Sequence, residues 1–234
     1  MADLSEFPIA SRWPAKDPSV IQLYSYPTFN GVKVSIALEE LGLPYEPHLV
    51  TLADKDVKSP EFLSLNPNNK IPAIIDPDGP DGAPVGLFES GAILLYLAEK
   101  TGKLIGETAT DKAKITQWLM FQMGGVGPMF GQLGFFWKFA GKDIEDDRPR
   151  NRYRDEAIRL LAVVDKELEG KNWIAGNYSI ADIALVPWLN AVNFYDVAEE
   201  VGLADFKNVT AYIDRFFARD AVQRAKRVPD PSKH

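Results

Sequence analysis

The chain has 234 residues, of which 46% are hydrophobic, and this is enough to fill a sizeable buried core in two domains. Its formal net charge of −7 argues against a general nucleic-acid or anionic-membrane role, because no broad basic field attracts such polyanions. The absence of cysteine excludes a protein thiol or disulfide redox pair, and two histidines, His48 and His234, leave no metal cluster.

The sequence also bears on where the protein acts. No apolar run approaches about 18 residues, the length that a membrane-spanning helix needs. Met1, Ala2 and Asp3 do not open the charged and apolar pattern of a secretion signal. We therefore expect a cytoplasmic protein whose partners include neither a membrane nor nucleic acid.

The first 18 residues are polar and proline-rich, and we expect them to form an arm over the protein surface. Strand-like alternation follows in residues 21–26, and then a loop in residues 27–31. A helix is predicted next, because apolar residues share one of its faces; these are Val34, Ala37, Leu38 and Leu41. Gly42 and Pro44 end that helix.

The next stretch predicts strand, helix, strand, strand and helix. Residues 45–51 favour a second strand, and Ser59 begins a short helix. Residues 71–75 form a short apolar strand, a turn-rich cluster follows, and residues 85–88 return as another strand before a helix that starts at Glu89. Because a βαβ crossover is right-handed, the first two strands should be parallel and the last two an antiparallel hairpin. This is a thioredoxin-like arrangement.

Two features of this stretch suggest a ligand site. Pro72 stands at the mouth of a strand, where proline is tolerated at an edge or as a cis turn, and it leaves the backbone groups of Ile71 to pair with a ligand. Glu89 and Ser90 offer a carboxylate, a hydroxyl and unpaired helix N–H groups, which suit the zwitterion of an α-amino acid. Taken alone, the Glu89–Ser90 pair is most often a plain helix cap.

Strand signals vanish from residue 110 onward. Residues 115–122 run at helical spacing until the segment 124–128, rich in glycine and ending in proline, where a kink is expected. Ser179 and Asp182 form a predicted capping box. The sequence thus predicts an α/β thioredoxin-like N-terminal domain followed by an all-α C-terminal helical domain. The predicted segments are an arm at 1–18, the thioredoxin-like domain at 19–104, the helical domain at 110–228 and a tail at 229–234.

Several motifs resemble those of cytosolic glutathione transferases. They are Y-P-T-F-N-G at 26–31, N-P-N-N-K-I-P-A-I at 66–74, F-E-S-G-A-I-L-L-Y-L-A-E-K at 88–100, G-P-M at 127–129 and Y-S-I-A-D at 178–182. These motifs span both predicted domains. Within that superfamily the chain is most similar to the bacterial nu-class, whose members are glutathione-dependent disulfide-bond reductases.

The resemblance implies roles for residues near the first strand and its neighbours. Thr28 and Asn30 would be the catalytic donors to the glutathione thiolate, and Asn30 would also contact the bound glutathione. Tyr24 and Tyr26 offer a rival donor, because many glutathione transferases use a tyrosine near the end of the first strand. Strand alternation puts both tyrosines on one face. The resemblance nevertheless favours Thr28 and Asn30.

The resemblance also implies how glutathione would be held. Ile71, beside a cis Pro72, would bond the cysteinyl backbone, Glu89 the γ-glutamyl amine and Ser90 its carboxylate. Further cations for the two carboxylates would come from Lys70 and Arg152, although without the resemblance Arg152 reads as an ordinary surface arginine. The implied co-substrate is reduced or oxidised glutathione, with no metal, and the implied assembly is a homodimer.

The chain departs from the family pattern at two places. Where a glutamine that contacts glutathione is expected, the sequence has Asp56-Val57-Lys58. After G-P-M, the family's polar stretch is replaced by Leu133-Gly134-Phe135-Phe136-Trp137. Such an aromatic stripe is usually core, but it would form an apolar acceptor site with Phe29 if it faced the cleft.

The expected function is therefore glutathione-dependent thiol chemistry. Its leading form is reduction of a small disulfide, since a chain without cysteine must take both thiols from glutathione. An organic peroxide is another substrate for the same thiol. The alternatives are a conventional conjugating glutathione transferase acting on hydrophobic electrophiles, and a glutathione-binding module without turnover.

Overall fold

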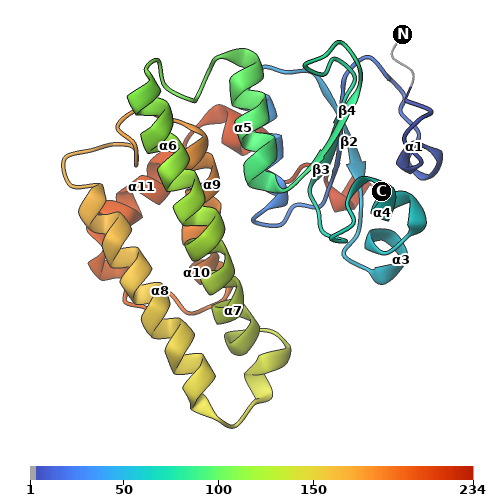
Figure 1. Ribbon diagram of the computed structural model, residues 1–234. Helices are drawn as coiled ribbons and strands as arrows, with labels where there is room; N and C mark the ends of the chain where they lie inside the picture. Colours follow the sequence, from blue (N-terminus) through green and yellow to red (C-terminus); the bar gives the residue numbers. More distant parts are fainter. Residues whose placement is uncertain (1–3, 234) are drawn as a thin grey trace. The chain divides into compact units, whose positions relative to one another are not determined.

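The computed structural model describes residues 4–233 and separates into two compact units (Figure 1). The first unit comprises Met1–Gly102 together with Asp220–His234, and the second comprises Lys103–Arg219. Met1 to Asp3, on which the expectation of no secretion signal depends, and His234 lie outside the described residues. Over residues 4–233, none of the helices has both the length and the apolar character needed to cross a bilayer.

The first unit is built on a four-stranded sheet in the order β2-β1-β3-β4. Its strands are β1 (Ile21–Ser25), β2 (Tyr45–Leu49), β3 (Ala73–Asp76) and β4 (Val85–Phe88). β1 and β2 are parallel because a helix returns the chain between them, whereas β3 and β4 form an antiparallel hairpin. Both predicted orientations are confirmed. β3 pairs with β1 in the antiparallel sense, which makes the sheet mixed.

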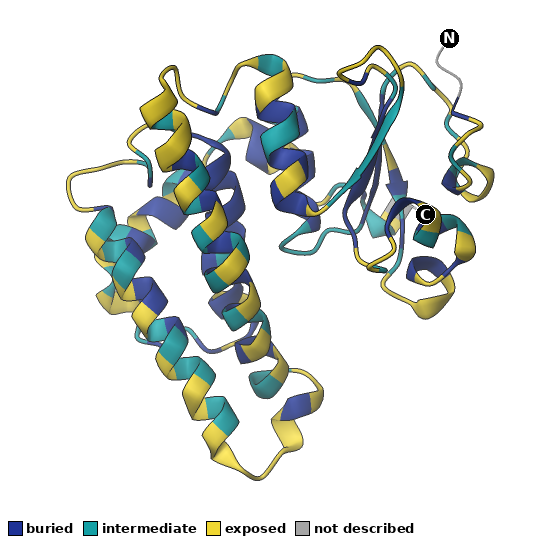
Figure 2. Ribbon diagram, viewed as in Figure 1, coloured by how far each residue is buried: buried dark blue, intermediate teal, exposed yellow. Residues whose placement is uncertain are grey.

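Helices lie on both sides of this sheet (Figure 1). On one side, α2 (Gly31–Leu41) packs against α5 (Ser90–Thr101) and against α12 (Asp220–Ala225). On the other side are the short helices α1 (Ile9–Arg12), α3 (Asp54–Val57) and α4 (Pro60–Leu65). This is the predicted thioredoxin-like architecture. The central strands β1 and β3 are buried between these layers, whereas the edge strands β2 and β4 are mostly half-buried (Figure 2).

Local sequence explains where these helices begin and end. Gly42 and Gly102, at the ends of α2 and α5, have φ angles of 68° and 66°, a left-handed conformation that glycine adopts at little cost. Ser59 caps α4 by accepting the Phe62 N–H at 3.2 Å, with Pro60 in the first turn, where its missing N–H costs nothing. Turn chemistry and caps therefore set these boundaries without help from distant residues.

The segment before β1 covers the side of the sheet on which the short helices α3 and α4 lie. Leu4 and Ile9 are buried there, and the indole Nε1 of Trp13 donates to the Leu49 carbonyl at 3.0 Å. Buried apolar residues of the arm and of the sheet side that it covers form one cluster, which we call the arm cluster. Its members are Leu4, Ile9, Tyr24, Val50, Val57, Phe62, Leu65, Ile71, Ala73 and Ile75. The described part of the arm is thus a structural layer of the first unit.

The second unit is helical, as predicted. Its main helices are α6 (Ala109–Phe121), α7 (Gly127–Trp137), α8 (Asp147–Glu167), α9 (Ile180–Leu189), α10 (Ala191–Phe194) and α11 (Lys207–Phe217). Two 3₁₀ segments, Ala140–Asp143 and Leu203–Asp205, connect them. Buried positions recur along α8 (Figure 2), because its apolar residues repeat at helical spacing.

The expected interruption after α6 takes the form of a π-helical turn, Gln122–Val126, that leads directly into α7. Gly124 and Gly125 lie in this turn, and Pro128 follows in the first turn of α7. Because proline has no N–H to donate backward, the regular hydrogen-bond ladder cannot run through this point.

The capping box of α9 is confirmed. Ser179 accepts the N–H of Ala181, and the Asp182 carboxylate accepts the Ser179 N–H at 2.8 Å. Tyr212 donates to the other Asp182 oxygen at 2.6 Å, which ties α11 to the start of α9. Burial raises the pKa of Asp182, and the hydrogen bonds that it accepts act in the opposite direction. The box is therefore a buried junction inside the second unit.

The C-terminal helix α12 belongs to the first unit, a grouping that the sequence pattern does not reveal. The Ser35 hydroxyl of α2 donates to the Ala225 carbonyl at 3.1 Å. Arg224 donates to the Glu39 carboxylate of α2 at 2.7 Å. These contacts, together with apolar packing, fix α12 against α2.

Candidate active site

The sheet register gathers the polar segments of the first unit at one end of the sheet. Ala73 of β3 lies opposite Tyr24 of β1 and opposite Phe88 of β4, both in antiparallel pairs. The residues before Ala73 therefore lie between those that follow β1 and those that follow β4. Three segments meet here: the loop 26–30, Lys70 to Pro72, and Glu89 with Ser90 at the start of α5.

Thr28 is fixed against the first turn of α2. Its hydroxyl oxygen accepts the Gly31 N–H at 3.1 Å, and its carbonyl accepts the Val32 N–H at 3.0 Å. Gly31 is required here, because a Cβ would lie 1.9 Å from the Tyr26 carbonyl oxygen. A hydroxyl that accepts through a lone pair keeps its own hydrogen as a donor. Half-buried Asn30, the predicted second donor, precedes α2 directly.

The peptide bond between Ile71 and Pro72 is cis, as expected. The Ile71 side chain is 8% exposed and belongs to the arm cluster, whereas the neighbouring Lys70 is exposed. Asn66 braces this segment, since its amide nitrogen donates to the Lys70 carbonyl and its amide oxygen accepts the Asn68 N–H at 2.9 Å. Sequence reasoning missed this role of Asn66, although the N-P-N-N-K run is a signal for a side-chain-braced turn.

Glu89 has a backbone conformation that is rare outside glycine, with φ at 72°. Such a conformation costs on the order of 1 kcal/mol and persists where the surroundings require it, commonly at ligand sites. The Glu89 side chain is exposed and makes no cap hydrogen bond to α5, so the plain helix-cap interpretation does not account for its carboxylate. Ser90, by contrast, is 3% exposed and is the first residue of α5.

A buried lysine stands behind Ser90 and was missed at the level of sequence. Lys33 of α2 is fully buried, and its Nζ lies 3.3 Å from the Ser90 hydroxyl oxygen. Burial lowers the pKa of Lys33 to about 7, and the negative field of Glu89 opposes that shift. The signal that points to Lys33 is a lysine inside the apolar run V-K-V-S-I-A-L.

The rival tyrosines face the arm cluster. Tyr24 is fully buried, its ring stacks on His48, and its hydroxyl has no hydrogen-bond partner among the described residues. Burial, with a contribution from Glu46, raises the pKa of Tyr24 far above its ordinary value. Tyr26 is partly buried and packs against the same cluster. Tyr24 is therefore enclosed in packing that leaves its hydroxyl away from the polar segments.

Asp56, at the place where the family pattern expects glutamine, serves the arm. Its carboxylate binds the guanidinium of Arg12 at 2.8 Å and accepts the Thr51 N–H at 3.1 Å. Burial works to raise the pKa of Asp56, but the hydrogen bonds from Thr51 and Arg12 outweigh it and hold the pKa below its usual value. The departure from the family pattern thus supplies an anchor for α1.

Two predicted features lie in the second unit. Arg152 is an exposed residue of α8. In the aromatic stretch, Phe135 is 41% exposed. Phe136 stacks on Tyr153, with ring centroids 5.5 Å apart. Trp137 is half-buried, and the guanidinium of Arg150 lies over its ring. The stretch is therefore only partly a core element, and its first aromatic ring presents apolar surface.

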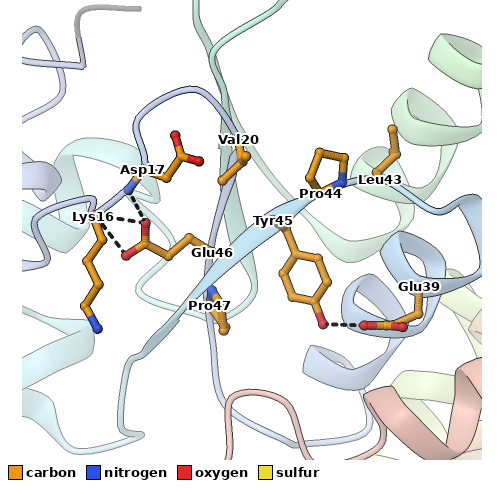
Figure 3. Close-up of a pocket in the computed structure, with 9 residues that line it drawn as sticks. All are labelled: Lys16, Asp17, Val20, Glu39, Leu43, Pro44, Tyr45, Glu46 and Pro47. Carbon is orange, nitrogen blue, oxygen red and sulfur yellow. Dashed lines mark hydrogen bonds between the residues drawn. The ribbon is translucent and has the colours of Figure 1, made fainter. Parts of the chain in front are cut away.

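A cavity of about 530 Å³ opens at the other end of β1 and β2 (Figure 3). On one side of it, the Glu46 carboxylate accepts the backbone N–H groups of Lys16 and Asp17 at 2.8 to 3.0 Å. On the other side, the Tyr45 hydroxyl donates to Glu39 at 3.1 Å. These polar groups bind one another, so we assign them to attachment of the arm and of α2.

Across the part of the chain that the structure describes, no group of three or more histidine, aspartate or glutamate side chains is placed to hold a metal ion. The segments that meet at this end of the sheet carry the Thr28 hydroxyl and the Asn30 amide after β1, and the backbone groups of Ile71 before β3. They also carry the Glu89 carboxylate and the Ser90 hydroxyl at the start of α5. Such a set can bind an extended, zwitterionic peptide through hydrogen bonds.

Comparison with known proteins gives the family. The glutathione S-transferase N-terminal domain matches residues 19–99, and the glutathione S-transferase C-terminal domain matches residues 131–220. The disulfide-bond oxidoreductase YfcG of Escherichia coli strain K12 is 44% identical over 208 residues, covering 88% of this chain and 94% of that protein.

Solved structures agree with this assignment. A glutathione transferase from Burkholderia graminis, with two glutathione molecules bound per subunit, is 61% identical with a TM-score of 0.96 and covers 99% of this chain and 97% of its own. One from Pseudomonas putida, with one glutathione disulfide bound per subunit, is 56% identical with a TM-score of 0.95, covering 97% of this chain and 99% of its own. With both domains matched and these similarities running along nearly its whole length, the chain belongs to the glutathione S-transferase family.

Proposed function

We propose that the protein reduces small disulfides with bound glutathione. The observation that carries this proposal is the combination of a chain without cysteine and similar proteins that bind two glutathione units per subunit. Similar proteins bind two glutathione molecules or one glutathione disulfide per subunit, which are the states expected before and after such a reaction. Because the chain supplies no thiol, both electrons must come from two glutathione molecules.

The reaction balances as two thiol–disulfide exchanges. The thiolate of one glutathione attacks a sulfur of the substrate, the substrate S–S bond breaks, and a mixed disulfide forms as the first substrate thiolate leaves. The second glutathione thiolate attacks the glutathione sulfur of that mixed disulfide and releases the other substrate thiolate. The products are glutathione disulfide and two substrate thiols, so two electrons have passed to the substrate and the protons of the two glutathione thiols end on the products.

Thr28 and Asn30 would serve the attacking thiolate. Lowering a thiol pKa from about 8.5 to about 7 requires on the order of 2 kcal/mol. One or two hydrogen bonds to a charged acceptor contribute about 1.5 to 3 kcal/mol each, so two donors suffice. The bond from the Gly31 N–H to the Thr28 hydroxyl oxygen fixes that hydroxyl in place before glutathione arrives.

The remaining polar groups would hold the tripeptide. Ile71, anchored by its buried side chain, would pair its backbone with the cysteinyl unit. Glu89 would accept from the γ-glutamyl amine, and Ser90 with the N-terminus of α5 would receive the γ-glutamyl carboxylate. Lys70 and Arg152 are proposed as further cations for the glutathione carboxylates.

We also propose that the enzyme works as a homodimer. The large apolar side chains that are exposed in the described part of the chain include Leu52, at 56% in the first unit, and Met120, at 50% in the second. Burial of such side chains against a second copy would stabilise a symmetric pair.

The cytoplasm, a reducing compartment with a large glutathione pool, suits the proposed activity.

One set of assays on a single preparation tests the function. Reduction of hydroxyethyl disulfide by glutathione is followed through coupled oxidation of NADPH by glutathione reductase, conjugation is followed with chlorodinitrobenzene, and glutathione binding is measured by calorimetry. We expect disulfide reduction to exceed conjugation. Conjugation without disulfide reduction would favour a conventional transferase, and binding without either reaction would favour a module that only binds glutathione.

A further inference from the structure

Helix α2 carries a lysine at a position where the helix is otherwise packed into the core. Its residues from Gly31 to Leu38 are all buried, and Lys33 among them is fully buried. A buried ammonium is costly, because it loses its hydration, and it is tolerated only where other groups compensate. Lys33 therefore requires an explanation in terms of what its amine contacts.

The Lys33 amine contacts the start of α5. Its Nζ lies 3.3 Å from the Ser90 hydroxyl oxygen, and the carboxylate whose field acts on it is that of Glu89. The hydroxyl and the carboxylate belong to adjacent residues at the helix start where the glutamyl end of glutathione is proposed to bind.

Two charged side chains on the elements that pack against α2 are bound to other partners. Arg224 of α12 binds Glu39. Lys100 of α5 binds Asp76 and Asp78. The negative field of Glu89 favours the charged form of Lys33, and a negative ligand beside Ser90 would add a second charge of the same sign.

We propose that Lys33 is a positioning residue of the glutathione site, which orients the Ser90 hydroxyl and balances the charge of the glutamyl carboxylate. The ammonium donates to the Ser90 oxygen, so the Ser90 hydroxyl hydrogen is left to donate to the carboxylate. The positive charge then stands directly behind that hydroxyl. This inference rests on the proposed function, because Ser90 is assigned there to the glutamyl carboxylate.

The arrangement couples glutathione binding to a proton. Without ligand, burial holds the pKa of Lys33 at about 7, so near neutral pH part of the population carries no charge on this amine. A carboxylate bound at Ser90 favours the ammonium form and should draw in the missing proton. The bound thiol, whose pKa is proposed to fall, releases protons in the same pH range, so the uptake at Lys33 is measured as a difference between ligands. Near neutral pH, glutathione should take up more protons, or release fewer, than an analogue without the glutamyl carboxylate, as calorimetry reports from buffers with different heats of ionisation.

The test uses Lys33→Met, which keeps the length of the side chain and removes its charge. Calorimetry compares glutathione with an analogue whose glutamyl carboxylate is a carboxamide, and a glycyl ester of glutathione serves as the matched control ligand. We expect Lys33→Met to weaken glutathione and its glycyl ester by about tenfold or more, to change the affinity for the carboxamide by less than about threefold, and to abolish the difference in proton uptake between glutathione and the carboxamide.

A matched protein control separates charge from helix packing. Ser35→Ala removes a buried hydrogen bond from α2 to Ala225 and leaves Lys33 and Ser90 in place. It should keep both the glutathione affinity and the proton uptake, even if its melting temperature falls. Lys33→Arg restores the charge and should recover part of the affinity that Lys33→Met loses.

Several results would overturn the inference. A folded Lys33→Met protein with unchanged glutathione affinity removes Lys33 from the site, and an equal loss for glutathione and the carboxamide shows a purely structural role. If Lys33→Met does not fold, the wild-type protein decides, because equal proton uptake with both ligands contradicts the proposal, whereas greater uptake with glutathione than with the carboxamide supports it. Failure of the wild-type protein to bind glutathione at all would instead remove the proposed function on which the inference rests.

Discussion

The ring of Tyr24 is stacked on the imidazole of His48, with centroids 4.7 Å apart and planes inclined by only 14°. Trp13 from the arm meets the same ring edge-on, at 6.4 Å between centroids. The tyrosine near the end of the first strand is thus held between the sheet and the arm. Its hydroxyl is buried without a hydrogen-bond partner in the described part of the chain. Such a hydroxyl lowers the free energy of unfolding, because it loses its hydrogen bonds to water and gains none in the folded protein.

Tyr24→Phe should therefore leave the enzyme active. Removing an unsatisfied buried hydroxyl should keep or raise the free energy of unfolding, by up to about 1 kcal/mol, and change kcat/KM for disulfide reduction by less than about threefold. Tyr26→Phe should likewise cost less than about threefold. Urea unfolding and steady-state kinetics on both variants check this. Loss of activity in Tyr26→Phe, with Thr28→Ala fully active, would point to a tyrosine-type conjugating transferase instead.

Thr28→Ala and Asn30→Ala should each lower kcat/KM for disulfide reduction by about tenfold or more, which matches roughly 1.4 kcal/mol for one lost bond to the thiolate. Thr28→Ala also takes away the acceptor of the Gly31 N–H, so it should cost about 1 kcal/mol of stability. Thr28→Ser keeps the hydroxyl and serves as the control. Equal activity in Thr28→Ala and Thr28→Ser would remove the hydroxyl from the mechanism.

Glu89→Gly should separate stability from binding. Glycine adopts a φ of 72° without strain, so the free energy of unfolding should rise by about 1 kcal/mol. Loss of the carboxylate should at the same time weaken glutathione by roughly 1 to 3 kcal/mol, and Ser90→Ala should weaken it by a similar amount. Glu89→Gln, which keeps the strain and removes the charge, completes the set. Calorimetry that finds full affinity in both Glu89→Gly and Ser90→Ala would leave this pair as a helix start only.

Lys33 should give the stability of the protein a distinctive pH dependence. Its pKa is about 7 in the folded protein against 10.5 as the ordinary value, so between these values the unfolded chain binds a proton that the folded chain has released. The free energy of unfolding should therefore rise with pH across this window, by up to about 1.4 kcal/mol per pH unit, and this contribution should be flat below it. Urea unfolding of wild type and Lys33→Met at a series of pH values measures the difference; parallel slopes would contradict it.

The protein should behave as a dimer in solution. Light scattering coupled to size exclusion should report about twice the chain mass of 26.0 kDa at micromolar concentration. Leu52→Glu and Met120→Glu place charges on the exposed apolar positions and should shift the population toward the monomer. A wild-type mass of one chain at micromolar concentration would refute the dimer.

The elements that sequence predicts well are those whose signals are local. Alternation in residues 21–25, the glycine after α2, and the strand at 85–88 all depend on near neighbours along the chain. The strand expected from Ile71 begins at Ala73, because its hydrogen-bonded register starts only after the cis bond to Pro72. The placement of the candidate site follows from this hairpin, because its register determines which segments meet at one end of the sheet.

The parts that sequence does not reveal depend on distant packing. The packing of α2 against α5 decides whether the Lys33 amine is exposed to water or buried against Ser90, and these two helices are far apart along the chain. The role of Asp56 depends on Arg12, which belongs to an arm that carries no strong pattern of its own. Likewise, the enclosure of Tyr24 results from the arm folding back, and strand alternation alone leaves the choice between the tyrosines and Thr28 open.

The arm also bears on how the protein can be cut. The match to the family's N-terminal domain begins at residue 19, so a truncation placed at that boundary would look conservative. It would nevertheless remove Leu4 and Ile9 from the arm cluster and Trp13 from its surface, which would expose the rings of Tyr24 and Phe62 to water. It would also leave the Asp56 carboxylate without Arg12. A protein shortened in this way, or nicked by a protease within residues 14–18, would expose apolar surface and become prone to aggregation, although every residue assigned to glutathione would still be present.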